Sequence, residues 1–241
     1  MSSIKKALVI GATSGIGKEL AKLLVNDGYK VIITGRRDEL LKEIKAANPE
    51  NYDIKRHDVT NLDSNIQLFE ELKKEYKSIQ LIVYNSGVGE ANYKLDWEKE
   101  NAILQTNVIA ATQIYGLAYN YFRRQSYGHL VGISSIASIR GNRHAPSYFA
   151  SKAFQVNYLE SLYMKGKRSK SKIYVTDIRP GFVDTAMALG DTFWMSSVEK
   201  ATKQIFTAIQ KKKRKAYITK RWRLIALVLK IVPTSLLYKF S

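Results

Sequence analysis

The sequence has no cysteine and only three histidines, His57, His129 and His144. Without cysteine the chain forms no disulfide and no thiolate metal site, and the wide spacing of the histidines argues against a histidine metal centre, so we expect no bound metal. The chain also lacks a run of about 20 apolar residues, which a membrane-spanning helix requires. The apolar run at residues 7–10 is shorter than the ~7–15-residue core of a secretory signal. These absences predict a cytoplasmic protein.

Acidic residues are scarce in the last third of the chain. The 241 residues include 39 Lys and Arg against 21 Asp and Glu, a net charge of +18. Residues 1–164 contain 21 basic and 17 acidic residues, whereas residues 165–241 contain 18 and 4. A nucleic-acid-binding domain would carry its basic residues more evenly, so the lopsided charge indicates a basic appendage on an ordinary domain.

Short apolar runs alternate with amphipathic stretches along the whole chain. This alternation indicates a parallel sheet with helices on both faces, and unbroken apolar strands fit a sheet that is covered on both sides. We therefore predict a doubly wound α/β fold in a single domain over residues 1–220, followed by a helical tail over residues 221–241. Expected strands cover residues 6–10, 30–34, 52–57, 79–84, 129–134, 172–178 and 216–219. Expected helices cover residues 15–27, 39–47, 62–76, 101–124, 147–165 and 197–210.

The first expected strand runs into a glycine-rich turn at the start of the first expected helix. Glycines let the backbone turn tightly and let a pyrophosphate approach it, while the helix N-terminus offers free N–H groups and the positive end of the helix dipole. This strand–turn–helix context predicts a dinucleotide site, although the alternative is a tight turn without a ligand. The turn contains Gly11, Thr13, Ser14, Gly15, Ile16 and Gly17.

Two arginines follow the second expected strand, where a nicotinamide cofactor would place its adenosine ribose. An acidic residue there would bind a free 2′-hydroxyl, but the chain has Gly35 followed by Arg36 and Arg37. Guanidinium groups suit a 2′-phosphate, so the pattern favours NADP(H) over NAD(H). The alternative is that both arginines are solvated at the start of a helix.

Four polar residues indicate chemistry at the carboxyl ends of the later strands. Tyr148 and Lys152 lie four apart on an expected helix and so share a face, and Ser135 ends the strand before them. Asn107 falls on an otherwise apolar helix stripe, where a buried amide requires a hydrogen-bond partner or a water, and the alternative is a purely structural asparagine. The stripe consists of Ile103, Ala110, Ile114, Leu117 and Tyr121.

The ordered set of motifs along the chain is more specific than any one of them. In chain order it comprises Gly11-x-x-x-Gly15-Ile16-Gly17, Asp58-Val59, Asn85-Ser86-Gly87, Asn107, Ser135, Tyr148-x-x-x-Lys152 and Pro180-Gly181. Over residues 4–185 this set resembles the short-chain dehydrogenase/reductase family. The resemblance implies a Rossmann-type fold and an oxidoreductase that transfers hydride between NADP(H) and a carbonyl or secondary alcohol substrate. The alternative from another class is a catalytically silent nucleotide sensor or membrane-surface binding module of the same fold.

The resemblance implies a role for each of the four polar residues. Tyr148 would donate a proton to the carbonyl oxygen or accept one from the alcohol, and Lys152 would lower the pKa of Tyr148 and bind the nicotinamide ribose. Ser135 would hold the substrate oxygen. Asn107 would position a water that links Lys152 to solvent.

The resemblance also implies further contacts with the cofactor. Asp58 and Val59 would flank the adenine. The path of the ribose and nicotinamide would be lined by Asn85, Ser86 and Gly87. The nicotinamide carboxamide would be received by Pro180, Gly181, Val183 and Thr185.

Apolar residues are frequent after Pro180, where a lid over the substrate is expected. They favour a lipophilic carbonyl or alcohol, and the alternative is that they only pack the lid onto the domain. The lid residues are Phe182, Met187, Leu189, Phe193, Trp194 and Met195.

The C-terminal tail joins a basic stretch to an apolar one. Residues 211–215 and 220–223 hold eight basic residues and no acidic one. The apolar positions that follow repeat on one helical stripe. Two alternatives remain open. Either the tail docks on a second subunit or over the substrate cleft, or residues 211–241 make peripheral contact with anionic lipid. Nucleic acid is disfavoured as a partner. The stripe consists of Leu224, Leu227, Val228 and Ile231.

The resemblance further implies a homodimer or homotetramer that pairs through the two longest expected helices. Apolar side chains on these helices are expected to be exposed and to supply the contact. They are Tyr115, Tyr119, Phe122, Phe154 and Tyr158.

Overall fold

The computed structural model describes residues 4–185 and 194–237. Within them, seven strands form one parallel sheet: β1 (Lys5–Ile10), β2 (Tyr29–Gly35), β3 (Tyr52–Arg56), β4 (Leu81–Tyr84), β5 (Tyr127–Ile133), β6 (Lys172–Pro180) and β7 (Lys215–Ile218). Their order across the sheet is β3-β2-β1-β4-β5-β6-β7. The chain runs outward from β1 to β3, returns to β4 beside β1 and runs outward again to β7. The loops after β1 and β4 therefore diverge at the carboxyl edge, where ligands bind in such sheets.

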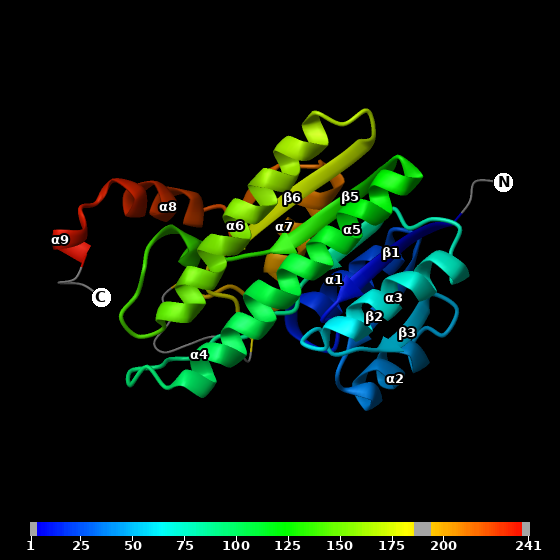
Figure 1. Ribbon diagram of the computed structural model, residues 1–241, viewed down its shortest axis with the longest axis horizontal. Helices are drawn as coiled ribbons and strands as arrows, with labels where there is room; N and C mark the ends of the chain where they lie inside the picture. The colour runs from blue at the N-terminus through cyan, green and yellow to red at the C-terminus, as the bar shows by residue number, and fades with distance from the viewer. Residues whose placement is uncertain (1–3, 186–193, 238–241) are drawn as a thin grey trace.

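Helices cover both faces of the sheet, as predicted (Figure 1). Successive side chains of a strand point to opposite faces, so Leu8 and Ile10 of β1 join one core while Ala7 and Val9 join the other. The first core is closed by α3 (Leu62–Glu75), α5 (Ala111–Gln125) and α6 (Pro146–Lys167). The second is closed by α1 (Gly15–Asn26), α2 (Asp38–Ala46) and α7 (Val198–Gln210).

The helix expected over residues 101–124 consists of three continuous segments. They are α4 (Trp97–Leu104), the π-helical η1 (Gln105–Ala110) and α5. α4 begins before the expected start because the Asp96 carboxylate accepts hydrogen bonds from the backbone N–H groups of Glu98 at 3.0 Å and Lys99 at 3.2 Å. The π-helical segment contains Asn107, and such segments are frequent at functional sites.

Most of the side chains that were expected to be exposed on the two long helices are buried inside the molecule. Tyr115 and Phe122 are fully buried and Tyr119 is 3% exposed, so the prediction that these three side chains face a partner is wrong. α5 packs against the sheet and against α3 and α6, so its apolar face is buried in the core of its own molecule. On α6, Phe154 is exposed and Tyr158 is half-buried.

The described residues of the tail after β7 are mostly helical. The helices are α8 (Trp222–Ile231) and α9 (Thr234–Leu237). α8 packs against β7 and against the 3-10 helix η2 (Ile136–Ile139), which follows β5. The described part of the tail therefore lies at the carboxyl edge of the sheet (Figure 1). Of the helices in the described residues, none has the length and apolar character that crossing a bilayer requires.

Candidate active site

The loop after β1 folds closely against the loop after β4. Gly11 has a φ of +87°, and a Cβ there would lie 2.6 Å from the Ser86 hydroxyl oxygen. A Cβ on Gly17 would collide with the Gly11 carbonyl oxygen. Asn85 ties the two loops together, because its Nδ2 donates a hydrogen bond to the Gly11 carbonyl at 2.7 Å. Only glycine fits at this crossing, which keeps the backbone accessible to a close-lying ligand.

Positive charge gathers at the start of α1. The Arg37 guanidinium donates hydrogen bonds to the hydroxyls of Thr13 at 2.6 Å and Ser14 at 2.8 Å. Ser14 is the N-cap residue of α1, and within the described chain its side chain makes no capping bond to the first turn, which contains no acidic residue. The positive end of the helix dipole and Arg37 therefore act on the same small region, as a phosphate site requires.

The ends of β2 and β3 place Arg36 near Asp58. The backbone N–H of His57 donates to the Gly35 carbonyl at 2.9 Å, which holds the two strand ends together. Burial raises the pKa of the Asp58 carboxyl, but hydrogen bonds from Thr60 and the Arg36 charge outweigh burial and keep it below its ordinary value. Asp58 therefore stays ionised beside the arginine.

Tyr148 reaches the loop after β4 from α6. A Cβ on Gly89 would lie 2.5 Å from the Tyr148 ring, so the ring fits there because position 89 is glycine. Burial raises the pKa of Tyr148 above its ordinary value, and a hydrogen bond with Ser135 opposes that rise. The Ser135 oxygen accepts a hydrogen bond from the Ala137 N–H at 3.1 Å, which leaves its own proton for Tyr148.

Lys152 lies one helical turn beyond Tyr148 and is 3% exposed. Its Nζ is 5.8 Å from the centre of the Tyr148 ring. The ammonium donates hydrogen bonds to the Ile133 carbonyl at 3.3 Å and to Gln155 Oε1 at 3.1 Å. Burial lowers the pKa of Lys152 to about 8, and the negative charge of Asp177 partly offsets this effect. Lys152 is therefore able to change its charge close to neutral pH.

Asn107 has the hydrogen-bond partners that its burial requires. Its Nδ2 donates to the Val88 carbonyl at 2.8 Å and to the Ser151 hydroxyl at 3.0 Å, and its Oδ1 accepts from the Val88 N–H at 3.0 Å. A Cβ on Gly87 would lie 3.5 Å from that Oδ1 and 3.3 Å from Lys152 Nζ. The Asn107 side chain thus fixes the loop after β4 close to the lysine.

Gln155 belongs to the site and was missed by the sequence analysis. It is fully buried, and its Nε2 donates to the Asn107 main-chain carbonyl at 2.8 Å while its Oε1 accepts from Lys152. The amide therefore bridges the lysine and the π-helical segment. A second polar residue three positions after Lys152, on the same inner helix face, was the signal that could have revealed it.

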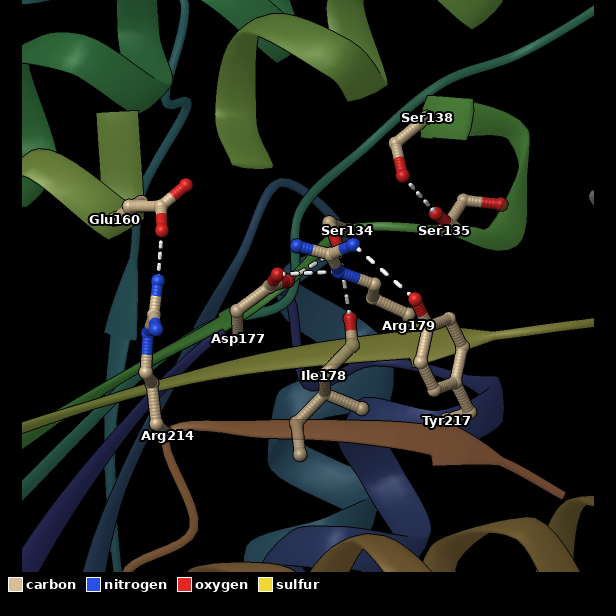
Figure 2. Close-up of polar contacts among 9 residues, drawn as sticks. All are labelled: Ser134, Ser135, Ser138, Glu160, Asp177, Ile178, Arg179, Arg214 and Tyr217. Atoms are coloured by element: carbon tan, nitrogen blue, oxygen red, sulfur yellow. Dashed lines mark hydrogen bonds and ion pairs between the residues drawn. The ribbon is translucent and has the colours of Figure 1, made fainter. Parts of the chain in front are cut away.

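A buried ion pair anchors the end of β5 next to Ser135 (Figure 2). The Ser134 hydroxyl lies 2.5 Å from Asp177 Oδ1 and 3.0 Å from the Ile178 carbonyl. Arg179 Nε donates to the other oxygen of Asp177 at 2.5 Å. This pair, which lies in the buried part of β6, was not predicted from the sequence. Because Ser134 directly precedes Ser135, the network restricts where the Ser135 hydroxyl can lie.

The segment after β6 lies over the glycine loop. β6 ends at Pro180, and a Cβ on Gly181 would collide with the ring of Trp222 on α8. Val183 is 6% exposed, and the Thr185 methyl group would lie 3.2 Å from a Cβ at Gly15. Thr185, one of the expected carboxamide-binding residues, thus lies next to the glycine loop.

Half of the predicted lid lies in the described residues. Trp194 is 50% exposed, Met195 is 44% exposed, and the Phe182 ring packs edge-on against Trp222 with ring centres 5.4 Å apart. The remaining lid residues lie outside the described residues; they are Met187, Leu189 and Phe193.

The predicted residues come together from six successive strand ends at one edge of the sheet. Those of the glycine loop follow β1, the arginines follow β2, and Asp58 with the buried Val59 follows β3. The loop after β4 holds residues 85–87, Ser135 follows β5, and residues 180–185 follow β6. Asn107 on η1 and Tyr148 and Lys152 on α6 complete the set. The order of strands across the sheet explains why residues so far apart in sequence share one edge.

Comparison with known proteins gives a consistent result. A family model described as short chain dehydrogenase matches residues 5–194. The chain is 35% identical over 199 residues to an uncharacterized oxidoreductase of Myxococcus xanthus, covering 80% of this chain and 78% of that relative. It is 30% identical over 178 residues to a probable NADP-dependent dehydrogenase of Haemophilus influenzae, covering 73% and 70%.

The fold also matches solved structures. A short-chain dehydrogenase from Sphingobium yanoikuyae, solved in complex with NADPH, superimposes with a TM-score of 0.81 at 18% identity, covering 95% of this chain and 97% of that one. At that identity the likeness concerns the fold alone, whereas the family model spans more than half of the sequence. The chain belongs to the short-chain dehydrogenase family of oxidoreductases.

Proposed function

We propose that this protein reduces a lipophilic carbonyl compound to a secondary alcohol with NADPH, and catalyses the reverse oxidation. The observation that carries the proposal is the meeting of Ser135, Tyr148 and Lys152 at the loop after β4, which itself folds against the glycine loop. A proton donor, a hydroxyl for the substrate oxygen and a cation near the cofactor ribose are the groups that such a reaction requires.

The residues present fit a dinucleotide that carries a 2′-phosphate. The glycine crossing leaves no side chain between the backbone and a pyrophosphate, and the start of α1 offers its N–H groups. Arg37 already binds two hydroxyls of this loop, and Arg36 is exposed beside it. Guanidinium groups favour NADPH over NADH. The names of similar proteins, which include an NADP-dependent dehydrogenase and an NADPH complex, support the same choice.

When bound, NADPH supplies the hydride that reduces the carbonyl carbon. Tyr148 donates its proton to the carbonyl oxygen, and solvent restores that proton after each turnover. The raised pKa of Tyr148 keeps the phenol protonated at neutral pH, so the side chain holds a proton that it can donate. Ser135 donates its single hydroxyl proton to the Tyr148 oxygen in the free protein and would donate it to the substrate oxygen when a carbonyl compound is bound, where it stabilises developing negative charge.

Lys152 lies close to the Tyr148 ring, and its ammonium donates a hydrogen bond to Gln155. Below about pH 8 its ammonium is charged and stabilises negative charge that develops on the phenol oxygen. Gln155 is a positioning residue, because it contacts Lys152 and the Asn107 carbonyl rather than the reacting atoms. Asn107 holds the loop after β4 and, in this proposal, also orders a water that links Lys152 to solvent.

The apolar side chains of the lid support the proposed substrate class. Phe182, Trp194 and Met195 are the described lid residues, and they offer aromatic and thioether surface to an apolar molecule.

We extend the proposal to a homo-oligomer that uses the exposed part of α6, where Phe154 is 37% exposed. Light scattering at micromolar concentration measures this directly, and a monomer mass contradicts it.

The function is tested by following NADPH absorbance with ketones and aldehydes of increasing chain length. NADPH consumption that depends on the carbonyl, with a matching amount of alcohol found by mass spectrometry, supports the proposal. A lower KM for longer chains supports the lipophilic substrate class. No turnover with any carbonyl, together with tight binding of NADPH, would instead indicate a nucleotide sensor.

A further inference from the structure

Helix α8 is firmly attached to the body of the protein by one face. Trp222 and Ala226 are each 2% exposed on this face. Arg140 binds the C-terminal end of the helix. Its Nε donates a hydrogen bond to the Leu229 carbonyl at 2.6 Å, and its Nη2 donates one to the Val232 carbonyl at 2.8 Å. Because these contacts satisfy the last carbonyls of the helix, α8 is an ordered part of the domain.

The opposite face of α8 is apolar and exposed. An α-helix advances 100° per residue, so the four side chains of this face lie together and about 180° from Trp222. Single exposed apolar residues are common on protein surfaces, but a contiguous group on one helix face indicates a partner. The group, which we call the outer face, consists of Leu224 (69% exposed), Leu227 (57%), Val228 (55%) and Ile231 (72%).

The surroundings of the outer face carry charge of one sign. Arg223 and Lys230 lie on the flank between the buried face and the outer face, and both are exposed. From residue 200 to the end, the chain has twelve basic residues and no acidic one. An apolar helix face with a cationic flank is the pattern of helices that lie in the interface of an anionic membrane.

The charge decides between a lipid surface and a second copy of the chain. In a two-fold dimer the same patch meets itself, so Arg223 and Lys230 of one copy would approach the same residues of the other. No acidic side chain of the tail is available to compensate them. Anionic lipid headgroups would neutralise the flank while the outer face enters the acyl region.

We propose that the outer face of α8 docks this protein on an anionic lipid surface. α8 has ten residues and is about 15 Å long, half of the ~30 Å hydrocarbon thickness, so it lies in the interface and does not cross it. α8 touches η2, which begins directly after Ser135, and Trp222 packs on Gly181. Docking therefore turns the lid side of the active site toward the bilayer. This last consequence, delivery of a membrane-dissolved carbonyl compound, rests on the proposed function; the docking itself does not.

Vesicle flotation tests the docking with the full chain. We expect the protein to float with vesicles of equal parts phosphatidylcholine and phosphatidylglycerol and to stay behind with pure phosphatidylcholine. Salt at about 1 M, where the screening length is about 3 Å, should reverse flotation at least partly. Absence of flotation with the anionic vesicles at low salt overturns the proposal.

Two pairs of variants separate the apolar and the ionic contributions. Leu227→Glu with Val228→Glu should abolish flotation, whereas Ile4→Glu with Ile66→Glu, which alters exposed apolar residues elsewhere by the same charge, should not. Arg223→Glu with Lys230→Glu should weaken binding at least about tenfold. The control of equal charge change, Lys74→Glu with Lys77→Glu on and after α3, should weaken it far less. Equal losses in variant and control would contradict a specific surface.

Two further readouts exclude the competing explanations. If Leu227→Glu with Val228→Glu halves the mass in light scattering and vesicles do not bind the parent protein, the outer face is a dimer contact and the proposal is wrong. Tyr148→Phe should float as well as the parent protein. Flotation therefore fails or succeeds independently of whether the proposed reaction occurs.

Discussion

The ammonium group of Lys152 donates a hydrogen bond to the side-chain oxygen of Gln155 at 3.1 Å, in a fully buried setting. The other end of the same amide donates to the Asn107 carbonyl, so the lysine is tied to the π-helical segment that forms one wall of the site. A water would be free to exchange at such a position. A side-chain amide is not, and it fixes the place of the lysine.

Replacing Gln155 by leucine should therefore lower kcat more than it changes the KM for NADPH. The variant removes a hydrogen bond to a charged group, worth about 1.5–3 kcal/mol, and leaves the volume nearly unchanged. Gln155→Glu places a carboxylate beside Lys152 and should move the high-pH limb of kcat/KM to higher pH. A merely structural role for Gln155 would lower stability in both variants and leave that limb in place.

The pH dependence of the reaction follows from the burial of Lys152. With a pKa of about 8 in the free protein, the ammonium loses its proton as pH rises through that value, and kcat/KM for reduction should fall there. Asp177 favours the charged lysine, so Asp177→Asn should move the fall to lower pH. Ser134→Ala removes a hydrogen bond to Asp177 without changing its charge and should leave the position of the limb unchanged. A limb that does not respond to Asp177→Asn contradicts this assignment.

Cofactor choice should depend on the two arginines after β2. Arg36→Ala and Arg37→Ala should each weaken NADPH binding by about 1–3 kcal/mol and leave NADH binding nearly unchanged, because only NADPH carries the 2′-phosphate. Isothermal titration calorimetry with both cofactors measures the difference. Arg124→Ala, an exposed arginine near the end of α5, serves as the control of equal charge. Parent protein that binds NADH more tightly than NADPH would refute the assignment.

The sequence predicted those parts of the structure that depend on local pattern. Apolar runs marked the strands, and glycine spacing marked the turn before α1, because burial on both faces and a close phosphate leave few alternatives. Asn107 stood out on its apolar stripe, and the structure supplies the partners that it requires.

Features that depend on which elements become neighbours were not predictable in this way. Helical periodicity identifies a face but not what covers it, so Tyr115 and Phe122 were assigned to a partner although their own sheet and α6 bury them. The ion pair of Asp177 and Arg179 has both charges on one strand, and only the depth of that strand in the sheet makes it unusual. Gln155 acquires its role through Lys152 and Asn107, which only the folded chain brings together.

The central claim is that Tyr148 transfers the proton in an NADPH-dependent carbonyl reduction. The direct test measures NADPH binding and turnover in parallel for the parent protein and Tyr148→Phe, which removes a single hydroxyl. We expect the variant to bind NADPH as tightly as the parent and to have a kcat lower by about 10²–10⁴-fold, the usual contribution of a general acid. A Tyr148→Phe variant with near-parental kcat on a carbonyl substrate would contradict the account.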